Sequence, residues 1–210
     1  MAERLNAPDL KSDEGREFLP GFESLTLRQL STVVLKLRWI FLWLTKQIGK
    51  LNMDLSFICD EQKFNYRVAA IIIDDHKILA MHDERSPYFY LPGGRVTLGE
   101  TAESAISREL REELHITAKI VRPLWLNQAF FTERIDKLRY HELCIYFLID
   151  VAKTDLLERG NRFIMTEGKR THVFEWLEFD RLKDEYFYPL FLKKEIFNLP
   201  QQFTIRTEIE

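Results

Sequence analysis

The sequence predicts an α/β fold, a sandwich in which helices cover both faces of a mixed sheet. Two observations predict it. Apolar runs rich in β-branched and aromatic residues fill much of residues 64–179, and one strongly periodic helical stretch interrupts them at 102–114. A second, shorter helical pattern follows the last apolar run, near residues 180–197. The order strand, strand, helix, several strands, helix is typical of such a sandwich.

Length and composition narrow the class of protein. The 210 residues allow one domain with a sizeable core and an appendage. The formal net charge is -3, so no polynucleotide partner is expected. The two cysteines, Cys59 and Cys144, are far apart and lack metal-binding spacing, which argues against a disulfide scaffold and indicates a reducing, cytoplasmic location.

The first 29 residues are expected to be a disordered tail. They contain Pro8, Pro20 and many charges, but few regularly spaced apolar residues. The stretch also resembles the peptide obtained when a transfer-RNA gene and its flank are read as protein. On that interpretation the coding start is placed too early, and Met53 is the natural start.

Residues 30–60 are predicted to be an apolar helical segment. Its core, LSTVVLKLRWIFLWL, has 15 residues, fewer than the roughly 20 that a helix needs to span a bilayer, so no membrane partner is expected. Three interpretations stay open: a helix packed on the domain, an interfacial helix with Trp39 and Trp43 at the headgroups, or translated non-coding sequence.

The domain itself is expected over residues 63–205, and its first half begins with a β-hairpin. Two β-branched runs joined by a polar turn at 74–77 predict that hairpin over residues 66–83. A loop with two prolines and a glycine pair then leads into a short extended segment, Arg95–Leu98. Thr101 is a good N-cap for a helix from about Ala102 to Leu114.

The second half is expected to contain more strands and two short helices. Strands are predicted at 124–131, 138–151 and 172–179, with a polar loop at 152–170. The helices are predicted at 180–186 and 189–197, with Pro189 at the first helical position of the last.

The helix at 102–114 carries carboxylates on its apolar side. At about 100° per residue, Glu113 lies about 20° and Glu109 about 60° from Ile106 of the apolar arc, while Glu112 lies about 120° away. Most charge runs on helices are solvated, which suits Glu112. An unpaired buried carboxylate such as Glu113 costs several kcal/mol, and like charges beside it raise that cost. Because the clustered donors are all oxygens, we expect a hard cation, Mg²⁺ with Mn²⁺ as the alternative.

These residues match a known pattern, G-x5-E-x7-R-E-(apolar)-x-E-E-x-G-(apolar), which is called the Nudix box. Through this box the chain resembles the Nudix hydrolases from about Phe64 to Pro200. The matching residues are Gly94, Glu100, Arg108, Glu109, Leu110, Glu112, Glu113 and Ile116. His115 stands where the pattern has glycine. Because this position follows a helix, a left-handed conformation is favoured there, and histidine adopts it at a cost of about 1 kcal/mol.

The resemblance implies a Nudix-type α/β/α sandwich and a pyrophosphohydrolase. Such an enzyme cleaves the diphosphate of a nucleoside diphosphate linked to another group, by water attack on phosphorus. The implied metal ligands are the Gly93 carbonyl and the carboxylates of Glu109, Glu112 and Glu113, with Glu100 as an auxiliary partner. Arg108 is implied to steady the glutamates. Outside the box, Glu142 and Glu167 are the two candidates for a base or further ligand.

The expected partner is a small-molecule nucleoside diphosphate derivative. Candidate substrate contacts are Arg85 for phosphate, and Tyr90 and Phe130 for base stacking. After the box the chain reads AFFTE, without the proline of the ADP-ribose subgroup or the tyrosine of the diadenosine-polyphosphate subgroup. A nucleotide sugar, a dinucleotide, a modified nucleoside triphosphate and a cap remnant therefore stay open. A homodimer, and a nucleotide-sensing module without turnover, are further alternatives, although the complete set of box carboxylates favours an enzyme.

Overall fold

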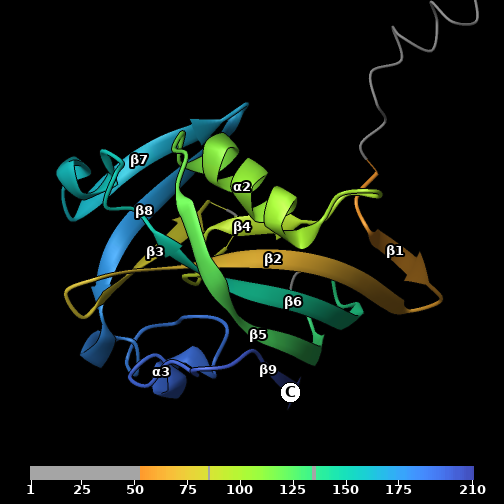
Figure 1. Cartoon of the computed structure of the whole chain (residues 1–210). Helices are drawn as coiled ribbons and strands as arrows, with labels where there is room; N and C mark the ends of the chain where they lie inside the picture. Colours follow the sequence, from red (N-terminus) through yellow and green to blue (C-terminus); the bar gives the residue numbers. More distant parts are fainter. Residues whose placement is uncertain (1–52, 85, 134–135) are drawn as a thin grey trace, which may run out of the picture. The chain divides into compact units, whose positions relative to one another are not determined.

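The computed structural model describes residues 53–84, 86–133 and 136–210 (Figure 1). The predictions for residues 1–52 and for Arg85 lie outside the described residues. The strands are β1 (Ser56–Cys59), β2 (Gln62–Asp74), β3 (Lys77–Asp83), β4 (Gly93–Arg95), β5 (Lys119–Thr132), β6 (Arg139–Asp150), β7 (Arg162–Glu167), β8 (Arg170–Glu178) and β9 (Thr204–Ile209). The helices are α2 (Ala102–Glu113) and α3 (Leu192–Glu195), with 3₁₀ turns at Leu156–Arg159 and Phe179–Arg181.

Strand β2 organises a mixed sheet whose order is β7-β8-β3-β2-β6-β5-β9. On one side β2 pairs in parallel with β6, from Gln62 to Ile72. On its other side it pairs antiparallel with β1, then β4, then the start of β3. Strand β4 therefore lies against the middle of β2, with Gly93 opposite Ala69 and Gly94 opposite Val68.

Side-chain alternation along β2 separates two hydrophobic cores. Val68, Ala70 and Ile72 pack in the core that contains Ile106 and Leu110 of α2. Ala69 and Ile71 belong to the core on the opposite face, which α3 and the segment before it cover (Figure 1). The predicted α/β sandwich with helices on both faces of a mixed sheet is confirmed.

The hairpin and the long helix form where the sequence predicts them. Strands β2 and β3 meet through a turn at Asp75 and His76. Helix α2 ends within one residue of its predicted limit, and the Thr101 hydroxyl accepts a hydrogen bond from the Ser104 backbone N–H at 3.2 Å. Both elements depend on local sequence, which explains why they could be predicted.

The predicted loop at 152–170 is wrong, because it contains β7. In RFIMTE only Phe163, Met165 and Glu167 turn inward, and the alternation was concealed because the outward Ile164 is apolar while the inward Glu167 is charged. Strand β1 forms at the end of the segment predicted to be helical, and β9 was also missed. Most residues of these two short strands stay exposed, so neither carries a strong apolar pattern.

The two C-terminal helices are shorter than predicted. Of the first, predicted at 180–186, only a 3₁₀ turn at Phe179–Arg181 forms, and α3 begins at Leu192, so Pro189 is not its first residue. Short helices have little intrinsic stability, and here burial of Leu192 and Ile196 decides where the helical turn forms. Within the described residues, no helix is long and apolar enough to cross a membrane.

Packing of α2 on the sheet can be tested at Ile106, which is fully buried. We expect Ile106→Ala to lower the free energy of unfolding by about 2–5 kcal/mol and Ile106→Val by about 0.5–1.5 kcal/mol, because each deletes buried methyl groups. Leu98→Ala, at a side chain that is 64% exposed, is the control and should stay within about 0.5 kcal/mol. Urea unfolding measures all three. Equal losses in Ile106→Ala and Leu98→Ala would contradict this packing.

Candidate active site

Two carboxylates of α2 are buried beneath the helix, as its periodicity predicts. Glu113 is 5% exposed and Glu109 is 8% exposed, whereas the Glu112 side chain is 44% exposed. Burial raises the pKa of Glu113 well above its usual range, the charge of Glu109 raises it further, and a 2.8 Å hydrogen bond from the Gly93 N–H opposes both effects. Burial also raises the pKa of Glu109, and Arg108 opposes this. Both acids therefore lack full compensation for their negative charge.

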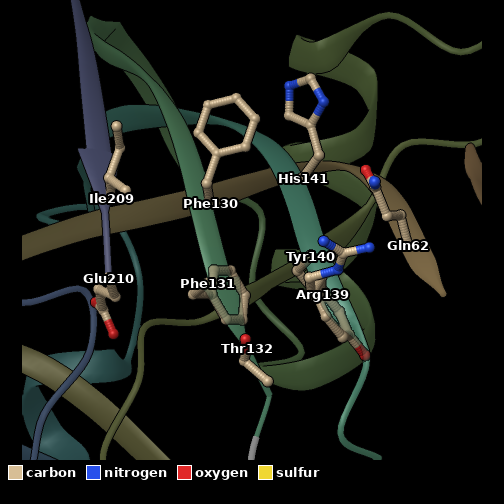
Figure 2. Close-up of a pocket in the computed structure, with 9 residues that line it drawn as sticks. All are labelled: Gln62, Phe130, Phe131, Thr132, Arg139, Tyr140, His141, Ile209 and Glu210. Atoms are coloured by element: carbon tan, nitrogen blue, oxygen red, sulfur yellow. The ribbon is translucent and has the colours of Figure 1, made fainter.

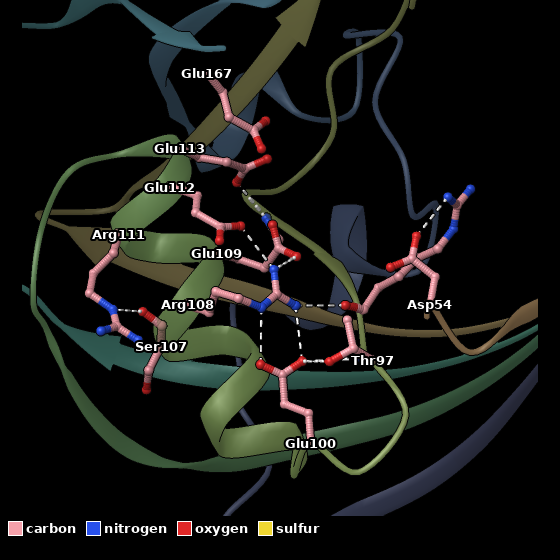
Figure 3. A network of polar contacts seen from close by, with 12 residues as sticks. Asp54, Thr97, Glu100, Ser107, Arg108, Glu109, Arg111, Glu112, Glu113 and Glu167 are labelled. Atoms are coloured by element: carbon pink, nitrogen blue, oxygen red, sulfur yellow. Dashed lines mark hydrogen bonds and ion pairs between the residues drawn. The ribbon is translucent and has the colours of Figure 1, made fainter. Parts of the chain in front are cut away.

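The Arg108 guanidinium forms several ion pairs and hydrogen bonds, which connect helix α2 to the segment before it (Figure 3). Its Nη1 lies 2.7 Å from Glu109 Oε1 and 2.9 Å from Glu112 Oε2. Its Nη2 donates to the backbone carbonyl of Arg95 at 2.9 Å. This geometry agrees with the steadying role that the family resemblance implies for Arg108.

Glu100 faces Arg108 with both carboxylate oxygens. The Arg108 Nε and Nη2 each lie 3.0 Å from one of these oxygens, and Thr97 donates to Oε2 from its backbone N–H and its hydroxyl. The Arg108 hydrogen bonds, with those of Thr97, lower the pKa of Glu100 to about 2. The contacts of Glu100 are therefore those of a residue that positions Arg108.

The glycine pair is needed for two different steric reasons. A Cβ on Gly94 would lie 2.2 Å from Glu109 Oε1, so any side chain there displaces this carboxylate. Gly93 has φ +142°, and a Cβ there would lie 2.2 Å from the Val68 carbonyl oxygen on β2. The close approach of β4 to both β2 and α2 therefore requires glycine at both positions.

The structure brings Glu167 to the buried carboxylates and pairs Glu142 with other residues. Glu167 ends β7, and its charge raises the pKa of both Glu109 and Glu113 (Figure 3). Glu142, on β6, lies 3.4 Å from Asn65 Nδ2 and 3.9 Å from Arg67 Nη1. Of the two candidates from outside the box, Glu167 is the one near the site, with a carboxylate oxygen within 4.8 Å of one of Glu113.

The sequence analysis missed His172, which lies beside Glu113 and Glu167. One ring nitrogen of His172 and one carboxylate oxygen of each glutamate lie within 4.8 Å of one another. Along β8, His172 shares a face with Phe174 and Trp176, two residues of the core below α2. A polar residue in phase with a buried apolar row was the signal that could have identified it.

The residues predicted to bind substrate lie in different places. The Tyr90 hydroxyl donates to Asp83 Oδ2 at 3.3 Å, and Glu113 contributes to the raised pKa of Tyr90, so this ring borders the site. Phe130 stacks on His141 at 4.5 Å and lines a hollow of about 230 Å³ at the other end of β2 (Figure 2). His141 pairs with Phe64, which lies five residues, or about 16 Å, along β2 from Ala69 beside Gly93.

A group of tyrosines beside Arg67 was not predicted. Tyr88 makes ring contacts with Tyr90, Tyr186 and Tyr188 at centroid distances of 5.1–6.3 Å. Burial raises the pKa of Tyr88 to about 12, and the nearby Arg67 guanidinium opposes that rise. Desolvation acts to lower the pKa of Arg67, but the charges of Glu142 and its other neighbours together hold the pKa above its usual value. The structure thus places the charged Arg67 next to a group of tyrosine rings, which we call the tyrosine wall.

The donor set fits a divalent cation. Two buried carboxylates repel each other; Arg108 acts on Glu109 and Arg67 on Glu113, yet burial still raises both pKa values, and a divalent ion would relieve both charges. Oxygen donors of this kind are the ones that Mg²⁺ and Mn²⁺ prefer. The residues of this structure that would hold such an ion are Glu109, Glu112 and Glu113, with the carbonyl of Gly93 beside them.

Taken together, the layered sheet, the acidic helix and the glycine pair define an α/β sandwich protein with a carboxylate centre. A NUDIX domain model matches residues 63–194, which is more than half of the chain. The chain therefore belongs to the NUDIX domain family, and the resemblance predicted from the box residues is confirmed.

Individual relatives match over part of their length. The ADP-ribose pyrophosphatase of Methanocaldococcus jannaschii is 35% identical over 92 residues, which cover 42% of this chain and 52% of that protein. The NAD-capped RNA hydrolase NudC of Edwardsiella ictaluri is 30% identical over 128 residues, covering 58% and 44% respectively. The chain thus spans about half the length of these curated relatives. The MutT protein of Bacillus halodurans aligns in structure with TM-score 0.47 and 17% identity, over 68% of this chain and 88% of that chain.

The Glu100–Arg108 pair predicts a pH-dependent contribution to stability. Because the pKa of Glu100 is lowered from 4.5 to about 2 in the fold, the pair stabilises above pH 4.5, and this stabilisation is lost as pH falls to 2. We expect Glu100→Gln to cost about 1–2 kcal/mol at pH 7 and much less at pH 2.5. Chemical denaturation of both proteins across this range measures the difference. A difference that does not change with pH would contradict the ion pair.

Proposed function

We propose that this protein is a metal-dependent pyrophosphohydrolase that cleaves the diphosphate of a nucleoside diphosphate linked to another group. The observation that carries the proposal is the pair of buried, incompletely compensated carboxylates, Glu109 held by Arg108 and Glu113 held by the Gly93 N–H of β4. Membership of the NUDIX family supports it. We propose Mg²⁺ as the cofactor, with Mn²⁺ as the alternative.

Each part of the site has a role in this reaction. Glu109, Glu112 and Glu113 would hold the cation, while Arg108 keeps two of these carboxylates at fixed positions. When bound, the cation would lower the pKa of a water molecule and offset the charge of the bridging phosphate oxygens. Glu167, whose charge acts on both buried carboxylates, is our candidate for accepting a proton from the attacking water or for a further cation ligand.

The substrate would enter along the tyrosine wall. Tyr88 and Tyr90 offer aromatic faces for a nucleobase, and Arg67 beside them offers a positive charge for phosphate. Two relatives are named for ADP-ribose and for NAD-capped RNA. Both compounds contain a diphosphate that joins adenosine to another group, so ADP-ribose and a dinucleotide are the first substrates to test.

Substitution of Glu113 separates catalysis from folding. We expect Glu113→Gln to reduce turnover of the active substrate by at least about 10³-fold, because a neutral amide is a poor cation ligand. Its melting temperature without metal should equal or exceed that of the unchanged protein, because the substitution removes a buried charge from beside Glu109 and Glu167. The measurements are nucleoside monophosphate release, with and without Mg²⁺, and calorimetry.

Glu142 and Glu167, the two glutamates from outside the box, give a matched comparison. Glu167→Gln should lower kcat by orders of magnitude more than Glu142→Gln, since the charge of Glu167 acts on the buried carboxylates and Glu142 is paired with Arg67. Equal, mild effects would exclude a single outside base. No turnover of a broad panel of diphosphate compounds, with tight binding of one of them, would instead indicate a nucleotide sensor.

A further inference from the structure

His172 is a buried histidine whose ring makes no hydrogen bond. It is 3% exposed, and neither Nδ1 nor Nε2 has a hydrogen-bond partner in this structure. Glu167 Oε2 lies 3.5 Å from Nε2, too far for an ordinary hydrogen bond. A buried polar group without a partner costs roughly 1–3 kcal/mol, so this side chain is expected to have a ligand.

The same imidazole is directed at the carboxylate cluster. Its ligating nitrogen and one oxygen each from Glu113 and Glu167 lie within 4.8 Å of one another. A cation bound at about 2.1 Å spans up to about 4.2 Å between opposite donors, so small side-chain rotations close the site. Glu167 is 34% exposed and stands at the tip of the β7–β8 hairpin, which leaves its side chain room to rotate.

We propose that Glu113, Glu167 and His172 together bind a divalent cation, and that His172 makes the metal centre bind Mn²⁺, the alternative cofactor named above, more tightly than Mg²⁺. The inference rests on the proposed function in one respect, that Glu113 is a metal ligand. Mg²⁺ takes oxygen ligands in a strict octahedron, whereas first-row transition ions, Mn²⁺ included, accept an imidazole nitrogen more readily than Mg²⁺ does. The nitrogen of His172 is therefore the feature that distinguishes this site from one made only of glutamates.

Direct coordination can be observed on bound Mn²⁺. We expect the pulsed electron paramagnetic resonance of Mn²⁺ bound to the full chain to show ¹⁴N modulation from an imidazole. The modulation should disappear in His172→Phe, which fills the volume of the ring without supplying a nitrogen. His82→Phe is the matched control, because His82 lies on the adjacent strand β3, contacts Phe89, and points to the opposite face of the sheet from His172.

Affinity gives a second, independent measurement. By calorimetric titration with each metal alone, His172→Phe should weaken Mn²⁺ binding by at least about tenfold, in the range seen when a metal ligand or its supporting partner is removed. Binding of Mg²⁺ should change less than threefold. Glu167→Gln should weaken Mn²⁺ binding in the same way, and this variant replaces His172→Phe should the latter fail to fold.

The outcomes separate this inference from the proposed function. Unchanged Mn²⁺ affinity in both variants, or bound Mn²⁺ without ¹⁴N modulation in the unchanged protein, would overturn the role of His172 while hydrolysis with Mg²⁺ still stands. If Glu113→Gln binds both metals as well as the unchanged protein does, the carboxylate centre itself is overturned, and the inference with it.

Discussion

The burial of two like charges next to each other is the constraint on which the rest of this site depends. Glu109 and Glu113 lie one helical turn apart on the inner face of α2, where the apolar arc also requires Ile106 and Leu110. The fold compensates them unequally. Arg108 reaches Glu109, whereas the described hydrogen bond to Glu113 comes from a single neutral donor, the Gly93 N–H. Because a carboxylate at 5% exposure loses most of its hydration, Glu113 is the point at which a cation gives the largest gain.

Strand β2 explains how residues distant in sequence come to surround that point. One edge of β2 pairs in succession with β1, β4 and β3. The two glycines of β4 therefore lie against the middle of β2, directly below α2. Gly93 packs closely against Val68 of β2, and Gly94 packs closely against Glu109 of α2. Because side chains alternate along β2, its neighbouring residues pack in different cores. Strand β4, paired with β2, is therefore held in place by packing on both faces of the sheet.

The predictable part of the site is the part that one helix determines. The 3.6-residue period alone placed Glu113 inside and Glu112 outside, and the Thr101 cap set the helix start. The choice between Glu142 and Glu167 needed the pairing of β7 with β8, which lay in a stretch whose alternation is concealed by an outward apolar residue and an inward charged one. The burial of His172 follows from the alternation along β8, but its position beside Glu113 could not be predicted, because the two residues are 59 positions apart in sequence and no local pattern records that they lie near each other.

His115 shows how the irregular position of the box contributes to the same geometry. It adopts φ 55°, the left-handed conformation expected after a helix, and so turns the chain sharply at the end of α2. The Leu114 carbonyl is thereby left for Arg159, whose Nη1 donates to it at 2.7 Å while its other nitrogens pair with Asp155. Arg159 ends the 3₁₀ turn just before β7, the strand that carries Glu167. The end of the helix that carries Glu113 is therefore hydrogen-bonded to the turn that leads into the strand carrying Glu167, so one contact connects two parts of the site that are 54 residues apart in sequence.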